Sequence, residues 1–311
     1  MEDIQWPSSK KVTFKKSNTF DKNKIDKIEN FFKNKYGSKF SILMPSSRAS
    51  ITLYIRYLNL NRSNLVSISK WSSHCLFTCI GAFTNISIAE TKADMIIVNH
   101  KWGNENKINK KINKKTKIIE DSVDSLPGKN FKIFPNNGDI EIISLPKIIG
   151  AVAGGIILTN NKKFFKYAKF YQKKNIKLGV DQSKKKIMLT NKNLNKFDNW
   201  YFNEAWNTFA EKNMVCDIFK NLINFDRNIE IISNRLEYLQ NTFKIKIDKK
   251  RLGPVIVLPY NKKIKLNNLT KFFNFKKNVF NEKFRKCFIL PLHFKISDQK
   301  FKKLVKLYHK I

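Results

Sequence analysis

The sequence predicts an α/β protein with a mostly parallel central sheet, followed by a smaller C-terminal α+β domain. Short apolar runs rich in β-branched residues alternate with stretches of helical spacing, which is typical of strands covered by helices on both faces. After Thr159 the pattern changes to longer helices and fewer strands. The chain has 311 residues, 42% of them hydrophobic, so it can bury the core of one large domain or of two ordinary ones. We expect an N-terminal arm over residues 1–20, a large α/β domain over 21–198, and a helical connection with the small domain over 199–311.

The first expected element is a helix with Asp21 as its N-cap, ending near Gly37. Its apolar residues recur every three or four positions. An extended stretch over 41–44 follows, and a turn of small residues then opens onto a helix over 51–58. Further β-branched runs predict strands over residues 65–69, 85–89, 95–98, 117–120, 140–144 and 155–159.

The connections and the C-terminal part follow from the same periodicities. Residues 72–82 have helical spacing, and the Lys- and Asn-rich stretch 107–117 predicts an exposed connection. Beyond Thr159 we expect helices over 161–174, 202–222, 228–243 and 297–309, strands over 255–258 and 286–290, and a loop over 184–196. Ser297 suits the N-cap of the last helix.

The net charge of +37 is carried mainly by lysine, since 54 of the 61 basic residues are Lys. Proteins that read nucleic-acid sequence use arginine for bidentate contacts, so the scarcity of Arg favours a solvated surface over a specific nucleic-acid reader. The charge would still attract anionic small ligands such as phosphates. The longest apolar run, 148–158, is too short to span a bilayer, and the chain starts without a basic and apolar leader. We therefore expect a cytoplasmic protein with reduced cysteines.

Three motifs could carry chemistry. Ser46, Ser47 and Arg48 precede a helix, where backbone N–H groups, hydroxyls and a guanidinium suit a phosphate, although Ser before a helix also serves as a plain cap. Glu120 and Asp121 end an apolar strand, and ligands of open α/β sheets bind at the carboxyl ends of strands. The alternative for this pair is a solvated strand end.

The third motif is Lys147, which follows a strand inside an apolar, Gly-rich stretch. Burial would lower the pKa of its amine and make it a nucleophile, whereas the alternative is a surface lysine in a turn. A phosphate cradle, an acid and an amine are together what pyridoxal phosphate (PLP) requires. The acid keeps the ring nitrogen protonated, and the lysine forms the Schiff base.

The order of these motifs resembles the DegT/DnrJ/StrS family of PLP-dependent sugar aminotransferases, of fold type I. The resemblance runs from about residue 41 to the C-terminus. It is carried by 45–51 (Pro-Ser-Ser-Arg-Ala-Ser-Ile), 97–103 (Ile-Val-Asn-His-Lys-Trp-Gly), 119–122 (Ile-Glu-Asp-Ser), Gly138-Asp139, Ser144, Pro146-Lys147, 154–160 (Gly-Gly-Ile-Ile-Leu-Thr-Asn) and 290–293 (Leu-Pro-Leu-His). Each segment is short, but together they form a specific pattern.

The resemblance implies roles for single residues. Lys147 would form the Schiff base, and Asp121 would pair with the pyridinium nitrogen. The remaining implied cofactor contacts are Ser47 and Arg48 in the phosphate turn, Ser144 near the phosphate, His74 or Trp71 stacked on the ring, and Asn199 reaching the phosphate of a neighbouring subunit. Asp124 stands where the family usually has Gln near the ring hydroxyl, and residues 104–116 and 176–198 are shorter than in typical members.

The family implies a PLP-dependent aminotransferase that acts as a homodimer. It would move an amino group from an amino-acid donor, usually glutamate, to a nucleotide-linked keto sugar for surface polysaccharide. A PLP-dependent sugar dehydratase is an alternative, although such relatives typically have His in place of Lys147. A catalytically degenerate binding protein and a basic nucleic-acid-binding protein are two further alternatives. A zinc site is disfavoured because His74, Cys75, Cys79 and His100 lack a second Cys pair.

Overall fold

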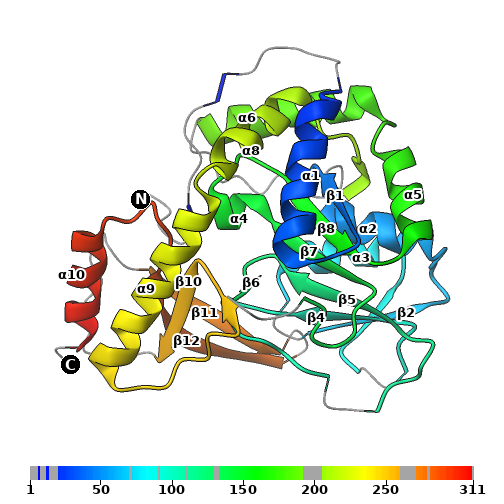
Figure 1. Cartoon of the computed structure of the whole chain (residues 1–311). Helices are drawn as coiled ribbons and strands as arrows, with labels where there is room; N and C mark the ends of the chain where they lie inside the picture. Colours follow the sequence, from blue (N-terminus) through cyan, green and yellow to red (C-terminus); the bar gives the residue numbers. More distant parts are fainter. Residues whose placement is uncertain are drawn as a thin grey trace.

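The computed structural model describes residues 6–7, 12–13, 20–69, 72–89, 92–108, 111–128, 133–191, 205–259, 271–278 and 281–309. Their main feature is a seven-stranded sheet with helices on both faces (Figure 1). The strand order is β1-β8-β7-β5-β4-β2-β3. The bounds are β1 Phe40–Met44, β2 Leu65–Ile68, β3 Asn85–Ser87, β4 Met95–Asn99, β5 Lys117–Ser122, β7 Ile140–Ser144 and β8 Gly155–Thr159. In this sheet β8 runs opposite to the other six strands, so the predicted mostly parallel sheet is confirmed.

Both faces of the sheet are buried because alternate residues of each strand pack against different helices. Ile42 and Ile142 belong to one apolar cluster with residues of α2, α3 and α5. Leu43 and Ile143 belong to a second cluster with residues of α1 and α8. The helix bounds are α1 Lys22–Tyr36, α2 Ser47–Tyr57, α3 His74–Gly81, α4 Leu145–Ile149, α5 Lys162–Tyr171, α6 Ile176–Asn191 and α8 Lys212–Leu222.

The first helix shows how local sequence sets its ends. The Asp21 side chain accepts a hydrogen bond from the Lys24 backbone N–H at 3.1 Å, which satisfies a donor that has no partner inside the helix. Gly37 ends α1 at φ 68°, a left-handed conformation that glycine adopts without a Cβ clash. Both predicted helix ends are therefore confirmed.

A smaller α+β part forms the C-terminal end of the chain. It contains α9 Phe225–Phe243, α10 Asp298–His309 and a three-stranded sheet of β10 Val255–Pro259, β12 Asn281–Pro291 and β11 Lys271–Asn278. Leu239 of α9, Leu290 of β12 and Leu304 of α10 share an apolar cluster of their own. The predicted boundary between 198 and 199 lies outside the described residues. Within the described residues, no helix combines the length and apolar character needed to cross a bilayer.

Some predicted elements are wrong. The expected loop over 184–196 is helical up to Asn191, because Val180, Ser183 and Ile187 are buried at helical spacing beneath exposed lysines. The expected single helix over 202–222 is interrupted before α8, where the Asn207 side chain accepts from the Phe209 backbone N–H at 2.9 Å and forms a turn. Four short or polar elements have no counterpart in the prediction, namely α4, β11, β6 Leu126–Pro127 and its partner β9 Arg251–Leu252.

Candidate active site

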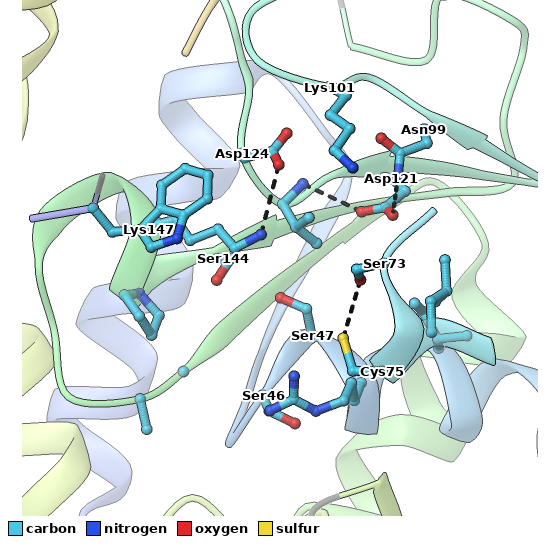
Figure 2. A pocket seen from close by; sticks show the side chains of 18 of the residues that line it. Ser46, Ser47, Ser73, Cys75, Asn99, Lys101, Asp121, Asp124, Ser144 and Lys147 are labelled. Atoms are coloured by element: carbon cyan, nitrogen blue, oxygen red, sulfur yellow. Dashed lines mark hydrogen bonds and ion pairs between the residues drawn. The ribbon is translucent and has the colours of Figure 1, made fainter. Parts of the chain in front are cut away.

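A cavity of about 580 Å³ opens where the parallel strands β4 and β5 end and where α2, α3 and α4 begin (Figure 2). Six of the predicted site residues line it, namely Ser47, Arg48, Asp121, Asp124, Ser144 and Lys147. They come from three separate stretches of the chain. The sheet therefore brings together the phosphate turn, the acidic strand end and the lysine, as the motif order predicts.

The start of α2 forms one wall of the cavity. Ser46 caps the helix in extended conformation, and its hydroxyl accepts from the Ala49 backbone N–H at 3.1 Å. The remaining N–H groups of the first turn have no partner inside the helix and lie at its positive end, which suits an anion. Gly155 of β8 packs directly beneath this turn, because a Cβ at Gly155 would lie 2.8 Å from the Ser47 backbone nitrogen.

Asp121 lies at the end of β5 and is 2% exposed. Its carboxylate accepts from Asn99 Nδ2 at 3.1 Å and from the Val123 backbone N–H at 3.3 Å. Burial, and then repulsion from Asp124, raise the pKa of Asp121 to about 7, while the charges of Lys147 and Lys101 act in the opposite direction. This carboxyl group can therefore hold or release a proton near neutral pH.

Lys147 lies in α4, a short helix that follows β7 directly and ends at Gly150 with φ 69°. Its Nζ is 3.6 Å from Asp124 Oδ2 and 4.7 Å from the centroid of the Trp6 ring. The Asp124 side chain is 4% exposed, and its other oxygen accepts from the Trp102 backbone N–H at 3.1 Å. The lysine thus lines the cavity, and its side chain remains 30% exposed (Figure 2).

Ser144 lines the cavity as the residue before α4. His74, which is expected to stack on the cofactor ring, does not line it. It is exposed at the first position of α3, although Ser73 and Cys75 on either side of it line the cavity. Successive residues of a helix point about 100° apart, and the rotation of α3 turns Cys75 and Leu76, but not His74, toward the cavity. Trp71 and Asn199 lie outside the described residues.

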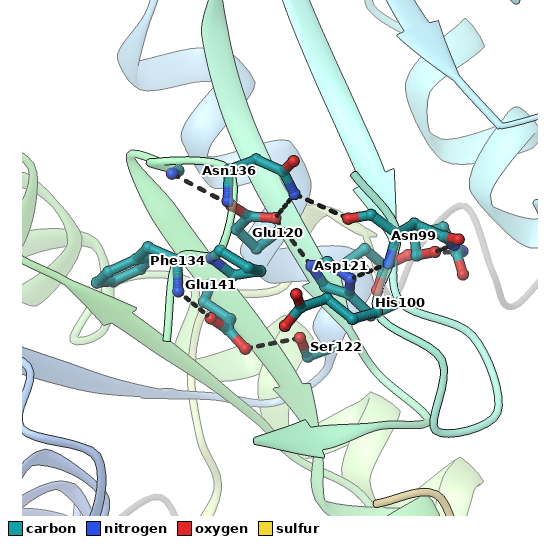
Figure 3. A network of polar contacts seen from close by, with 12 residues as sticks. Asn99, His100, Glu120, Asp121, Ser122, Phe134, Asn136 and Glu141 are labelled. Carbon is teal, nitrogen blue, oxygen red and sulfur yellow. Dashed lines mark hydrogen bonds and ion pairs between the residues drawn. The ribbon is translucent and has the colours of Figure 1, made fainter. Parts of the chain in front are cut away.

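Glu120, next to Asp121, points to the opposite face of the sheet, as alternation along a strand requires (Figure 3). It contacts His100 Nε2 at 2.8 Å and accepts from the Asn136 backbone N–H at 2.7 Å, so it stabilises the loops beneath the sheet. His100 and Asn136 each belong to a loop, and the buried carboxylate joins them.

A second buried carboxylate on this far side joins the two parts of the chain. Glu141 Oε1 accepts from the Ser122 hydroxyl and from Arg251 Nη1, both at 2.7 Å. Arg251 comes from β9 and is completely buried. It therefore ties the C-terminal part to β5 and β7 of the large sheet.

The cavity residues that the sequence does not predict include Trp6, Asn99, Lys101, Trp102 and Lys186. Asn99 ends β4 and Lys101 follows it, so the rule that selects Asp121 at the end of β5 would also have selected them. Burial lowers the pKa of Lys101, and the negative charges of Asp124 and Asp121 limit that effect. No local signal marks Trp6, which reaches the cavity from the far end of the sequence.

The side chains present fit PLP. A helix start with Ser47 and Arg48 suits the phosphate, a buried carboxyl suits the ring nitrogen, and Lys147 provides the amine. The buried Asn99 Oδ1, next to Asp121, has no hydrogen-bond partner among the described residues, so this end of the cavity has room for another polar group.

Residues 28–309 match a family model described as "Putative PLP-dependent aminotransferase". Among solved structures, the chain is similar to a DegT DnrJ EryC1 StrS aminotransferase from Brucella abortus, with 10% identity, 92% and 90% of the two chains covered and a TM-score of 0.60. It is also similar to "Putative sugar aminotransferase Spr1654 from Streptococcus pneumoniae, PMP-form", with 12% identity, 98% and 91% coverage and a TM-score of 0.61.

A third similar structure is the GDP-4-keto-6-deoxymannose-3-dehydratase ColD with bound GDP-perosamine, with 15% identity, 92% coverage of both chains and a TM-score of 0.61. No curated protein sequence matches the chain. The three structures are fold type I enzymes, and at these identities they establish the fold. The family model spans most of the chain, and the chain therefore belongs to this family of PLP-dependent aminotransferases.

Proposed function

We propose that the protein transfers an amino group from an amino-acid donor, glutamate, to the keto group of a nucleotide-linked sugar. The convergence of Lys147, Asp121 and the start of α2 on one cavity carries the proposal. We further propose that it works in the cytoplasm as a homodimer and serves surface polysaccharide synthesis. Similar structures are described with GDP-perosamine and with a TDP-sugar product, and a net charge of +37 favours a substrate that carries a diphosphate.

Each residue has a proposed task, and Lys147 has two. Ser47, Arg48 and Ser144 bind the phosphate of the cofactor, with Asn199 of a second subunit as a further contact. PLP, when bound, supplies an electron sink for the carbanion that remains when the donor Cα loses its proton. Asp121, ionised, would hold a proton on the pyridine nitrogen by charge pairing. Lys147 attaches the cofactor, and its freed Nζ takes the proton from the donor Cα as general base.

The test uses the purified full chain with added PLP. We expect an absorption band at the edge of the visible range that shifts when glutamate is added, with release of 2-oxoglutarate. A screen of keto-sugar nucleotides then identifies the acceptor by mass spectrometry of the aminated product. A protein that binds no PLP even in excess would refute the proposal, and a deoxygenated sugar product without amination would indicate a dehydratase.

Replacing Gly155 with alanine tests the phosphate task of α2. The added Cβ would meet the backbone of Ser46 and Ser47 at 2.8 Å, so the start of the helix must shift. We expect the dissociation constant for PLP to rise roughly tenfold, equivalent to about 1.4 kcal/mol. Gly81→Ala is the matched control, because its Cβ would have an ordinary contact of 3.5 Å with Ile86. Wild-type affinity in Gly155→Ala, measured by equilibrium dialysis, would contradict the task.

A further inference from the structure

Asp124 is a second buried carboxyl group on the cavity, beside Asp121. One of its oxygens accepts from the Trp102 backbone N–H at 3.1 Å, and the other lies 3.6 Å from Lys147 Nζ. Among the charged neighbours of Asp121, Asp124 raises the pKa of Asp121 the most. In the ligand-free protein, the Lys147 ammonium forms an ion pair with Asp124.

Lys147 cannot keep this partnership while it carries the cofactor. In the proposed function, Lys147 Nζ is bonded to a carbon of the cofactor. The nitrogen then carries fewer N–H groups that could donate to Asp124, and it occupies a different position. A buried carboxylate that loses its cation is strongly destabilising unless another cation takes over. Arg48, Lys101 and Lys186 are the other basic residues that line the cavity, and one of them can supply the positive charge that then balances Asp124.

Lys101 is placed to supply that charge. It lines the same cavity and directly precedes Trp102, whose backbone holds Asp124. Among the charges that act on the Lys101 amine, namely those of Asp124, Lys147, Asp121 and Cys75, that of Asp124 is the largest. The same loop thus carries both the lysine and a hydrogen-bond donor to Asp124.

The loop that carries Lys101 is held firmly. Trp102 has φ 55°, a left-handed conformation that is rare for a bulky side chain and persists only where the surroundings impose it. Gly103 follows at φ 78°, and its Cβ position would lie 2.9 Å from the Gly253 backbone nitrogen, so the two loops touch without side chains between them. This contact fixes the loop, and with it Lys101, relative to Asp124.

We propose that Lys101 replaces Lys147 as the counter-charge of Asp124 when the cofactor is bound. Lys101 is then a positioning residue that acts through Asp124 and makes the loaded state electrostatically balanced. The proposal rests on the attachment of the cofactor to Lys147. It also accounts for an acid at position 124, because the pair Asp124 and Lys101 is together neutral, as an amide side chain would be.

The experiment compares melting temperatures of Lys101→Met and wild type, each without PLP and with saturating PLP. Without PLP we expect the melting temperature to change little, because the lost contact of the Lys101 amine with the Trp102 ring, at 4.5 Å, is offset by the cost of burying the amine, and Asp124 keeps Lys147. With PLP we expect a clearly smaller rise than in wild type and a roughly tenfold higher dissociation constant. Lys101→Arg, which keeps the charge, should retain most of the rise.

Two further variants isolate the charge effect. Adding Asp124→Asn to Lys101→Met should restore the PLP-induced rise, because the acid that lacked a cation is gone. Lys169→Met is the control: Lys169 pairs with the buried Glu29 at 2.9 Å and does not line the cavity, so its loss should lower the melting temperature and leave the rise intact.

The outcomes separate this inference from the proposed function. A full rise in Lys101→Met, in a protein whose wild type does respond to PLP, overturns the inference alone. Failure of Asp124→Asn to restore the rise also overturns it, because Lys101 would then act through another group. No rise in the wild type overturns both the inference and the proposed function.

Discussion

Replacing Lys147 with alanine is expected to abolish covalent attachment of PLP and to lower the transamination rate by about 10⁴-fold or more. The variant loses both the amine that attaches the cofactor and the base that moves the proton of the donor Cα. It should still fold, because the Lys147 side chain is 30% exposed and Lys101 takes over the charge of Asp124 as proposed above. The measurements are the absorption band, the rate with glutamate and the unfolding free energy.

Reduction of the loaded wild type with borohydride, followed by peptide mass analysis, checks the position of attachment directly. The label is expected on Lys147. Lys163→Ala, which removes an exposed lysine at the start of α5, should behave as wild type in every measurement. A band that persists in Lys147→Ala, or a label on Lys101, would show that the wrong lysine was chosen.

Replacing Asp121 with asparagine is expected to stabilise the protein without cofactor and to weaken PLP binding by about 10–100-fold. The pKa of Asp121 is raised from 3.8 to about 7 in the folded state. The folded state therefore keeps a proton that the unfolded chain releases, so the stabilising contribution is complete below pH 3.8 and is lost as pH rises through about 7. A neutral amide removes this dependence.

The stability gain should therefore grow with pH. We expect Asp121→Asn to gain roughly 2–3 kcal/mol more over wild type at pH 8 than at pH 5, because each pKa unit corresponds to about 1.4 kcal/mol. Denaturant unfolding of the cofactor-free proteins at the two pH values measures the difference. Asp181→Asn removes the same charge from an exposed position of α6 and should change stability by less than about 0.5 kcal/mol. A gain that is the same at both pH values would contradict the raised pKa.

Much of the fold follows from local patterns. Continuous apolar runs mark the strands of the large sheet because both of its faces are covered, and Asp21 and Gly37 mark the ends of α1. The hairpin of β11 and β12 was predicted only in part, because Lys and Asn interrupt the apolar residues of β11. The helix α6 is not predicted, because a run of lysines conceals the buried residues at helical spacing.

For the cavity too, the sequence predicts some of the lining residues and not others. Asp121 lies at the end of β5 and Lys147 lies in the short helix that follows β7, so the ends of those strands predict their position. His74 and Cys75 are neighbours, and which of them faces the cavity depends on the rotation of α3, which the sequence does not set to within one residue. Trp6 reaches Lys147 only through tertiary packing against Val255 and Ile289. No periodic pattern in the sequence marks a residue that reaches the cavity from so far along the chain.

The guanidinium of Arg251 has a consequence for how substrates enter. It crosses from the C-terminal part into the large sheet and meets Glu141 with no exposure to solvent. Separating the two parts at this contact would break an ion pair between two completely buried groups, which is strongly unfavourable. We therefore expect donor and acceptor to enter and leave without a hinge motion at β9.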